Sequence, residues 1–90
     1  MAWWHDMKLL INDTFAANLG VLRNKSGLTQ QALTDKMQLL GSSLSRSSYA
    51  KIECGLSNIK VTDLAALKEV YHISYDDFFQ GVTAIETDES

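Results

Sequence analysis

Apolar residues recur three or four positions apart in five successive stretches of this chain, which is the spacing of one face of an α-helix. A glycine follows four of these stretches, and glycine is favoured just past a helix C-terminus. The pattern therefore predicts five amphipathic helices. Their apolar positions are Phe15, Leu19 and Leu22; Leu33, Met37 and Leu40; Tyr49 and Ile52; Val61, Leu64, Leu67 and Tyr71; and Phe78, Phe79 and Val82, and the glycines are Gly27, Gly41, Gly55 and Gly81.

Side chains that accept hydrogen bonds from a helix N-terminus precede four of the stretches. Residues 12–14 precede the first, Thr29 the second and Ser45 the third. Ser74, with Asp77 three residues later, predicts the cap of the fifth. Because no segment shows the sustained alternation of a strand, we expect an all-α fold, a compact bundle of five helices around one core.

Three regions are expected along the chain. Residues 13–82 form the helical domain, and residues 83–90 form an acidic, solvated tail with three acids in its last five positions. Residues 1–12 form an arm or an extra helix. The two tryptophans there, Trp3 and Trp4, either cover the core of this same domain or contact another subunit or a partner.

Composition narrows the class of protein. Apolar residues make up 46% of only 90 residues, and the single cysteine cannot form an internal disulfide. The chain has no apolar run near the ~20 residues of a membrane-spanning helix, and its start lacks the layout of a signal peptide. We therefore expect a soluble, cytoplasmic, single-domain protein with no membrane partner.

An enzyme has almost no support in this sequence. So small a core leaves little room for the deep pocket of a small-molecule substrate. Neither His5 nor His72 has acidic or cysteine neighbours at metal-ligand spacing, and the serines have no histidine base in register. We expect no catalytic residues, no metal, no cofactor and no small-molecule substrate.

Charge is distributed unevenly along the chain. The formal net charge is −3, but residues 23–60 hold six basic side chains and two acids, a net charge of +4. A basic segment within an acidic chain indicates an anionic partner, although a solvated surface explains dispersed bases equally well.

Three linked motifs carry a family resemblance. Leu28-Thr29-Gln30-Gln31-Ala32-Leu33 opens the second predicted helix, residues 44–55 form the third with Ser-Arg-Ser near its start and Ile-Glu-Cys-Gly at its end, and Ile73-Ser74-Tyr75-Asp76-Asp77-Phe78-Phe79 follows. In this order they resemble the lambda-repressor/Cro-like, or XRE, helix-turn-helix family over about residues 15–80. The resemblance implies a lambda-repressor-like bundle that contains a helix-turn-helix.

The chain departs from the family pattern at three places. Between Gln30 and Glu53 it is about five residues longer than the shortest members, and residues 39–44 must absorb the difference. Thr34 stands where the family usually places a small alanine, and Cys54 where it usually places a polar or basic residue. These departures concern the docking angle of the third helix and leave the fold unchanged.

The resemblance also implies roles for individual residues. Arg46, Ser47, Ala50 and Lys51 occupy base-reading positions on the third helix, opposite Tyr49 and Ile52, and arginine or lysine can donate to guanine in the major groove. Arg23 and Glu53 occupy positions that form a structural ion pair. The candidates for contacts to DNA phosphates are Gln30, Gln31, Ser48, Asn58 and Lys60.

These observations favour a sequence-specific DNA-binding transcriptional regulator, a repressor of phage or bacterial type, that binds a double-stranded operator as a homodimer. The alternative is a regulator that binds another protein, such as an anti-repressor that grips another repressor, or an antitoxin. The net charge and exposed-looking aromatic residues favour that alternative. The apolar candidates for a subunit or partner interface are Trp3, Trp4, Phe78, Phe79 and Val82.

Overall fold

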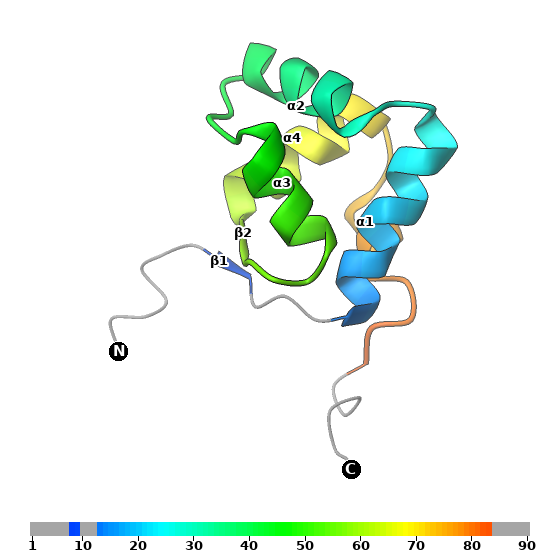
Figure 1. Ribbon diagram of the computed structural model, residues 1–90. Coiled ribbons are helices and arrows are strands. Elements are labelled where there is room, and N and C mark those ends of the chain that lie inside the picture. The colour runs from blue at the N-terminus through cyan, green and yellow to red at the C-terminus, as the bar shows by residue number, and fades with distance from the viewer. Residues whose placement is uncertain (1–7, 10–12, 84–90) are drawn as a thin grey trace.

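Four α-helices and a short 3-10 helix pack around one core in the computed structural model, which describes residues 8–9 and 13–83 (Figure 1). A pair of two-residue strands lies beside them. The all-α class is therefore confirmed, with four α-helices in place of five. In chain order the elements are β1 (Lys8–Leu9), α1 (Asp13–Ser26), α2 (Gln30–Leu39), α3 (Arg46–Glu53), β2 (Ile59–Lys60), α4 (Val61–Tyr71) and the 3-10 helix Tyr75–Phe79.

Local capping fixes where the helices begin. The Thr29 hydroxyl accepts a hydrogen bond from the Ala32 N–H (3.0 Å) at the start of α2. Ser45 does the same for the Ser48 N–H (3.2 Å) at the start of α3. Both caps were predicted from the sequence, and both are confirmed.

The fifth predicted helix is a 3-10 helix of five residues and not an α-helix. The predicted cap is present, because the Ser74 N–H donates to the Asp77 carboxylate (3.2 Å). The chain does not continue into an α-helix because Asn18 of α1 donates to the carbonyl oxygens of Phe78 and Gln80, each at 2.9 Å. These two bonds hold the segment against α1, and short 3-10 runs are common at such docked ends.

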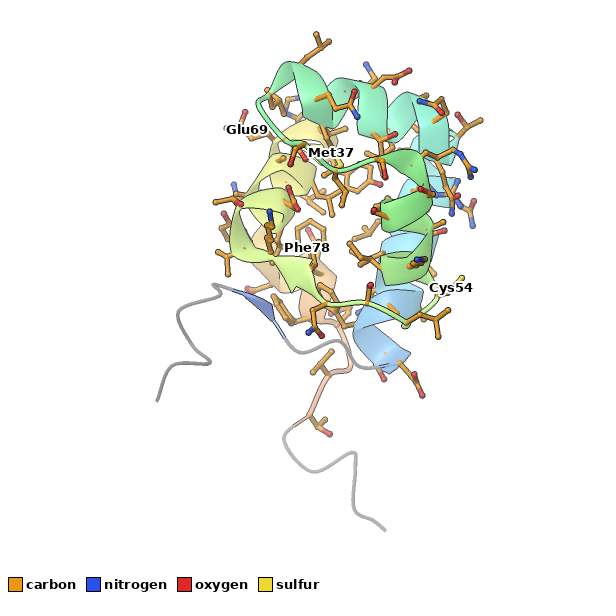
Figure 2. The ribbon with its side chains drawn as sticks, turned by 60° about the vertical axis from the view of Figure 1, so that its left-hand side comes forward. Met37, Cys54, Glu69 and Phe78 are labelled. Atoms are coloured by element: carbon orange, nitrogen blue, oxygen red, sulfur yellow. The ribbon has the colours of Figure 1, made fainter. Side chains whose placement is uncertain are left out.

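The core lies between the helices and receives side chains from every one of them. Figure 2 shows Met37 of α2 and Phe78 of the 3-10 helix in this interior. Each of the largest core side chains has essentially no exposed surface, so removal of any one would leave a cavity. They are Leu19, Leu33, Met37, Tyr49, Ile59, Leu67 and Phe78.

Thr34 is fully buried in α2 at the position where the resembling family has alanine. Its hydroxyl lies 3.1 Å and 3.2 Å from the carbonyl oxygens of Gln30 and Gln31, one turn earlier in the helix. A buried hydroxyl is tolerated when it has a hydrogen-bond partner. This departure is therefore accommodated within α2.

Residues 40–45 form the turn between α2 and α3. Leu39 ends α2 with 88% of its surface exposed, and Leu40 follows with 50% exposed. The Ser42 hydroxyl donates to the Asp63 carboxylate of α4 (2.9 Å), which ties the turn to the body of the domain.

The two strands join distant parts of the chain. β1 pairs antiparallel with β2, with Lys8 opposite Lys60 and Leu9 opposite Ile59. Figure 1 places this pair beside the loop that leaves α3. Of residues 1–12, predicted as an arm or an extra helix, the described pair forms a strand, and Trp3 and Trp4 lie outside the described residues.

Gly20 lies in the middle of α1, where glycine lowers helix stability. A Cβ atom there would lie 3.7 Å from Cγ and Cδ of Glu53, an ordinary contact distance. We expect Gly20→Ala to raise the free energy of unfolding by about 0.5–1 kcal/mol, measured by urea denaturation. Gly27→Ala is the contrasting variant, because Gly27 has a φ of +78° and its replacement should cost about 1 kcal/mol. Equal effects of the two changes would contradict this view.

Candidate nucleic-acid interface

α3 has one buried and one exposed face. Tyr49 and Ile52 point into the core, with 0% and 2% of their surface exposed. Arg46, Ser47 and Lys51 are exposed on the other side of the helix, and Ala50 is half-buried. The four predicted base-reading residues therefore share α3, but Ala50 lies at the border of the exposed face.

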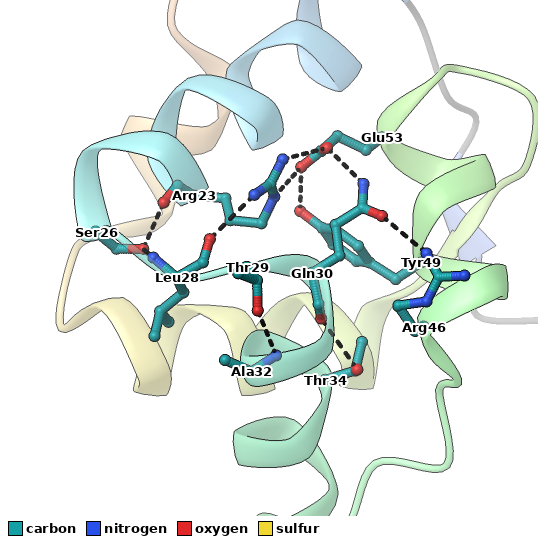
Figure 3. Close-up of polar contacts among 10 residues, drawn as sticks. All are labelled: Arg23, Ser26, Leu28, Thr29, Gln30, Ala32, Thr34, Arg46, Tyr49 and Glu53. Atoms are coloured by element: carbon teal, nitrogen blue, oxygen red, sulfur yellow. Dashed lines mark hydrogen bonds and ion pairs between the residues drawn. The ribbon is translucent and has the colours of Figure 1, made fainter.

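Glu53 at the end of α3 turns away from this exposed face. Its carboxylate accepts four hydrogen bonds: from Arg23 Nε (2.8 Å), Arg23 Nη2 (3.0 Å), Gln30 Nε2 (2.9 Å) and the Tyr49 hydroxyl (2.8 Å). Figure 3 shows these groups converging on Glu53 from α1, α2 and α3. The predicted ion-pair partners Arg23 and Glu53 are thus brought together, and one carboxylate links three helices.

Arg23 is held on both sides of its guanidinium group. Besides Glu53, it donates from Nη1 to the carbonyl oxygen of Leu28 (3.0 Å). The Arg23 and Glu53 side chains are only 16% and 12% exposed. Paired arginine and carboxylate in a two-bond arrangement give a directional contact, so this pair fixes α1 against α3.

The surroundings of Glu53 also set its protonation. Burial alone raises the pKa of its carboxyl, but the hydrogen bonds from Arg23, Gln30 and Tyr49 outweigh burial and hold the pKa below its ordinary value of 4.5. Burial raises the pKa of Tyr49 well above its ordinary range, so its hydroxyl keeps the proton that it donates. The network therefore contains one negative charge, matched by Arg23.

Acid should weaken the domain through this carboxylate. A pKa that is lower in the folded state gives stability that is present above the unfolded value and lost as the pH falls through the folded one. We expect the free energy of unfolding to drop as the pH falls below about 4.5, and Glu53→Gln to flatten that drop. Urea denaturation at several pH values measures both. An equally steep drop in the variant would place the acid sensitivity at other carboxyl groups.

Gln30 connects this network to the exposed face of α3. Its amide nitrogen donates to Glu53, and its amide oxygen lies 3.5 Å from Nη1 of Arg46, a long hydrogen bond. The side chain predicted to contact a phosphate is therefore engaged within the protein. The amide of Gln31, the next residue, donates to Asp35 one turn later in α2 (2.9 Å).

Three serine hydroxyls gather at the start of α3. Ser45 Oγ lies 3.0 Å from Ser48 Oγ and 3.3 Å from Ser47 Oγ, in addition to its capping bond. Ser47 and Ser48 are exposed. Hydroxyl groups of this kind can accept or donate as a ligand requires, which suits contacts to phosphates or base edges.

The remaining phosphate candidates lie beyond α3. Asn58 and Lys60 are exposed in the loop and strand between α3 and α4. Lys60 occupies the N-cap position of α4 and makes no capping hydrogen bond with its side chain. Within residues 8–9 and 13–83 its ammonium group takes part in no ion pair or side-chain hydrogen bond.

The apolar interface candidates on the 3-10 helix need one correction. Phe78 is fully buried in the core, so the prediction that it lies at an interface is wrong. Helical spacing marks Phe78 as apolar but does not say whether the domain itself covers it. Phe79 is 38% exposed and packs against Phe15 with the two rings tilted and their centroids 5.2 Å apart, and Val82 is half-buried.

Two features near α3, a hydrogen bond and an exposed apolar side chain, were missed by the sequence analysis. Tyr49 was assigned to the core alone, but its hydroxyl also donates to Glu53, and the four-residue spacing between them was a usable signal. Leu56, two residues after the C-cap residue Cys54, has 77% of its surface exposed, and no pattern in the sequence predicts that. Cys54 itself is exposed.

The described part of the chain, residues 8–9 and 13–83, holds no group of three or more His, Cys, Asp or Glu side chains placed to bind a metal ion. None of the helices in it combines the length and the apolar character needed to cross a membrane.

Comparison with known proteins gives one family. The model of the helix-turn-helix family of the lambda-repressor/Cro-like type matches residues 19–78, two thirds of the chain. No curated protein and no solved structure matches the chain. The match spans α2, the turn and α3, as well as the ion pair between Arg23 and Glu53. Proteins of this family are DNA-binding domains without enzymatic activity, and the family implies a DNA-binding regulator. The chain belongs to the XRE-type helix-turn-helix family.

Proposed function

We propose that this protein represses transcription by placing α3 in the major groove of an operator, with Arg46, Ser47, Ala50 and Lys51 at the base edges. The supporting observation is the charge of α3. Both of its basic side chains, Arg46 and Lys51, are exposed, while its one acid, Glu53, is turned inward and matched by Arg23. The exposed face is therefore positive although the whole chain is acidic.

Each base-reading residue has a distinct chemistry. The Arg46 guanidinium group can donate two hydrogen bonds to O6 and N7 of one guanine, and the Ala50 methyl group can contact a thymine methyl group. Ser47 can donate to or accept from either base of a pair. Lys51, five positions after Arg46, can reach a base edge or a phosphate.

Backbone contacts to DNA would come from both sides of α3. On one side lies the first turn of α2, where Gln30 and Gln31 carry backbone N–H groups that have no partner within the helix. Ser48, Asn58 and Lys60 would supply the other contacts. Because the Gln30 side chain is held by Glu53, we assign its contact to the backbone N–H group.

The test is a titration with duplex DNA at several salt concentrations. Duplexes retained from a random-sequence pool at low salt would supply the operator, and log affinity plotted against log salt should fall steeply. Lys51→Ala should reduce this slope by about one ion, because one phosphate contact is lost. Lys25→Ala, which removes an exposed cation from the end of α1, is the matched control and should leave the slope unchanged.

One observation favours a second candidate function, the binding of another protein. Leu56 is a large apolar side chain with 77% of its surface exposed, directly beside the C-terminus of α3. Apolar surface of this kind is typical of a protein interface. Failure of the chain to retain any duplex from the random pool, at any salt concentration, would favour this candidate over the operator-binding repressor.

A further inference from the structure

An apolar surface lies where α2 ends against α4. Leu39 and Leu40 are exposed there, with 88% and 50% of their surfaces in contact with solvent. Small residues of α4 lie beside them. We call this surface the α2–α4 face and define it by Lys36, Leu39, Leu40, Ala65, Ala66 and Glu69.

The α2–α4 face combines projections with hollows. One shallow hollow is lined by Leu40, Ala65 and Ala66 together with Glu69 and Thr62. A neighbouring hollow is lined on its α2 side by Lys36 and Leu39 and on its α4 side by Glu69. A leucine side chain that protrudes next to a hollow floored by alanines provides both halves of a knob-and-hole contact.

The face also carries two charges of opposite sign. Lys36 stands on the α2 wall and Glu69 on the α4 wall, and both are exposed. Within residues 8–9 and 13–83, neither takes part in an ion pair or in a side-chain hydrogen bond. The face therefore presents one unpaired cation and one unpaired anion beside its apolar centre.

We propose that the α2–α4 face binds the same face of a second copy of this chain. In a two-fold symmetric dimer, if a first residue of one copy contacts a second residue of the other copy, the same contact forms again with the two copies exchanged. Leu39 of each copy would enter the hollow beside Ala65 of the other, and each Lys36 would face the other copy's Glu69. The face carries both the protruding leucine and the hollow, and both the cation and the anion, so it is complementary to itself. Binding to an unrelated protein would require only one member of each pair.

This pairing leaves α3 free. In Figure 2, Glu69 lies on the opposite side of the molecule from Cys54, at the C-terminus of α3. At the other end of α3, Arg46 approaches Gln30 in the first turn of α2, whereas Leu39 ends α2. Association through the α2–α4 face therefore does not depend on the proposed operator binding, and each can fail without the other. It also differs from the predicted interface on the 3-10 helix, where Phe78 is buried.

The first test measures mass against concentration by sedimentation equilibrium on the full chain without DNA. The unmodified protein should approach the mass of a dimer, and Leu39→Asp should raise the dimer dissociation constant by about tenfold or more. Val21→Asp is the matched control, because it changes an exposed apolar residue of α1 outside the face and should leave the constant unchanged. A monomer at all concentrations, or a dimer that tolerates Leu39→Asp, would overturn the proposal.

Charge exchange gives the second test. Lys36→Glu would place like charges opposite each other across the axis, and Glu69→Lys would do the same with the other sign, so each should weaken the dimer. Both changes together restore opposite charges and should recover most of the lost affinity. Circular dichroism checks that each exposed substitution leaves the fold intact. A double variant that is weaker than either single variant would contradict the two-fold arrangement.

Discussion

Glu53→Ala should lower the free energy of unfolding by about 3 kcal/mol, near the lower end of the range for breaking a buried ion pair. The change removes the acceptor of four hydrogen bonds at once. It leaves the Arg23 charge with one carbonyl partner, at Leu28, and a buried Tyr49 hydroxyl without its acceptor. Stranded polar groups of this kind cost more than the bonds themselves contributed.

Chemical denaturation of matched variants measures this loss. Asp35→Ala removes an exposed carboxylate that accepts one hydrogen bond from Gln31, and it should change stability by no more than ~0.5 kcal/mol. Removal of Arg23 and Glu53 together should cost less than the sum of the two single changes, because no charge is then left unpaired. A Glu53→Ala loss no larger than that of Asp35→Ala would mean that the network does not hold the helices together.

Much of the fold could be predicted because its signals are local. Thr29 and Ser45 cap helices within three residues of themselves. Apolar spacing finds most of the buried positions of α1 to α4, but Leu40 and Val61, assigned to the same faces, are 50% and 42% exposed. The strand pair could not be predicted in this way, because the paired residues Lys8 and Lys60 are separated in the sequence by the whole helix-turn-helix. The 3-10 helix was predicted as an α-helix because local spacing does not reveal the contact that limits its length. That contact is with Asn18, 60 residues away in the sequence.

The residues of the candidate site could be predicted from the sequence, but the hydrogen bonds between them could not. The exposed face of α3 follows from the helical period once Tyr49 and Ile52 are assigned to the core. That the Gln30 side chain would bind Glu53 depends on how closely α2 approaches the end of α3, and no sequence pattern encodes that distance. The family resemblance supplied the ion pair, but not the two further donors of Glu53.

Arg46→Ala should cost about 1–3 kcal/mol of discrimination at one position of the operator and relax the preference there. Arg46 lies in the first turn of α3, where the helix enters the groove most deeply in the proposed arrangement. Within residues 8–9 and 13–83 its side chain makes one hydrogen bond, the long one to Gln30, so its removal should hardly affect folding. Competition between duplexes that differ at single positions measures the loss of preference.

Arg46→Lys is the informative companion variant. It keeps the charge but removes the planar fork that two-bond recognition of guanine requires. Salt dependence should therefore stay close to that of the unmodified protein, while the preference for guanine falls. Retention of full sequence preference in both variants would exclude Arg46 as a base-reading residue, and α3 would then have to bind DNA through other side chains or bind a protein partner.

The exposed Cys54 gives a practical route to these measurements. It is the chain's single cysteine, and it stands at the C-cap of α3, beyond the buried positions of that helix. A thiol-reactive dye would therefore attach at one site without any engineered change. Fluorescence from that site reports on the surroundings of α3, and the site lies away from the α2–α4 face. One labelled sample can thus distinguish occupation of α3 by DNA from association of two copies.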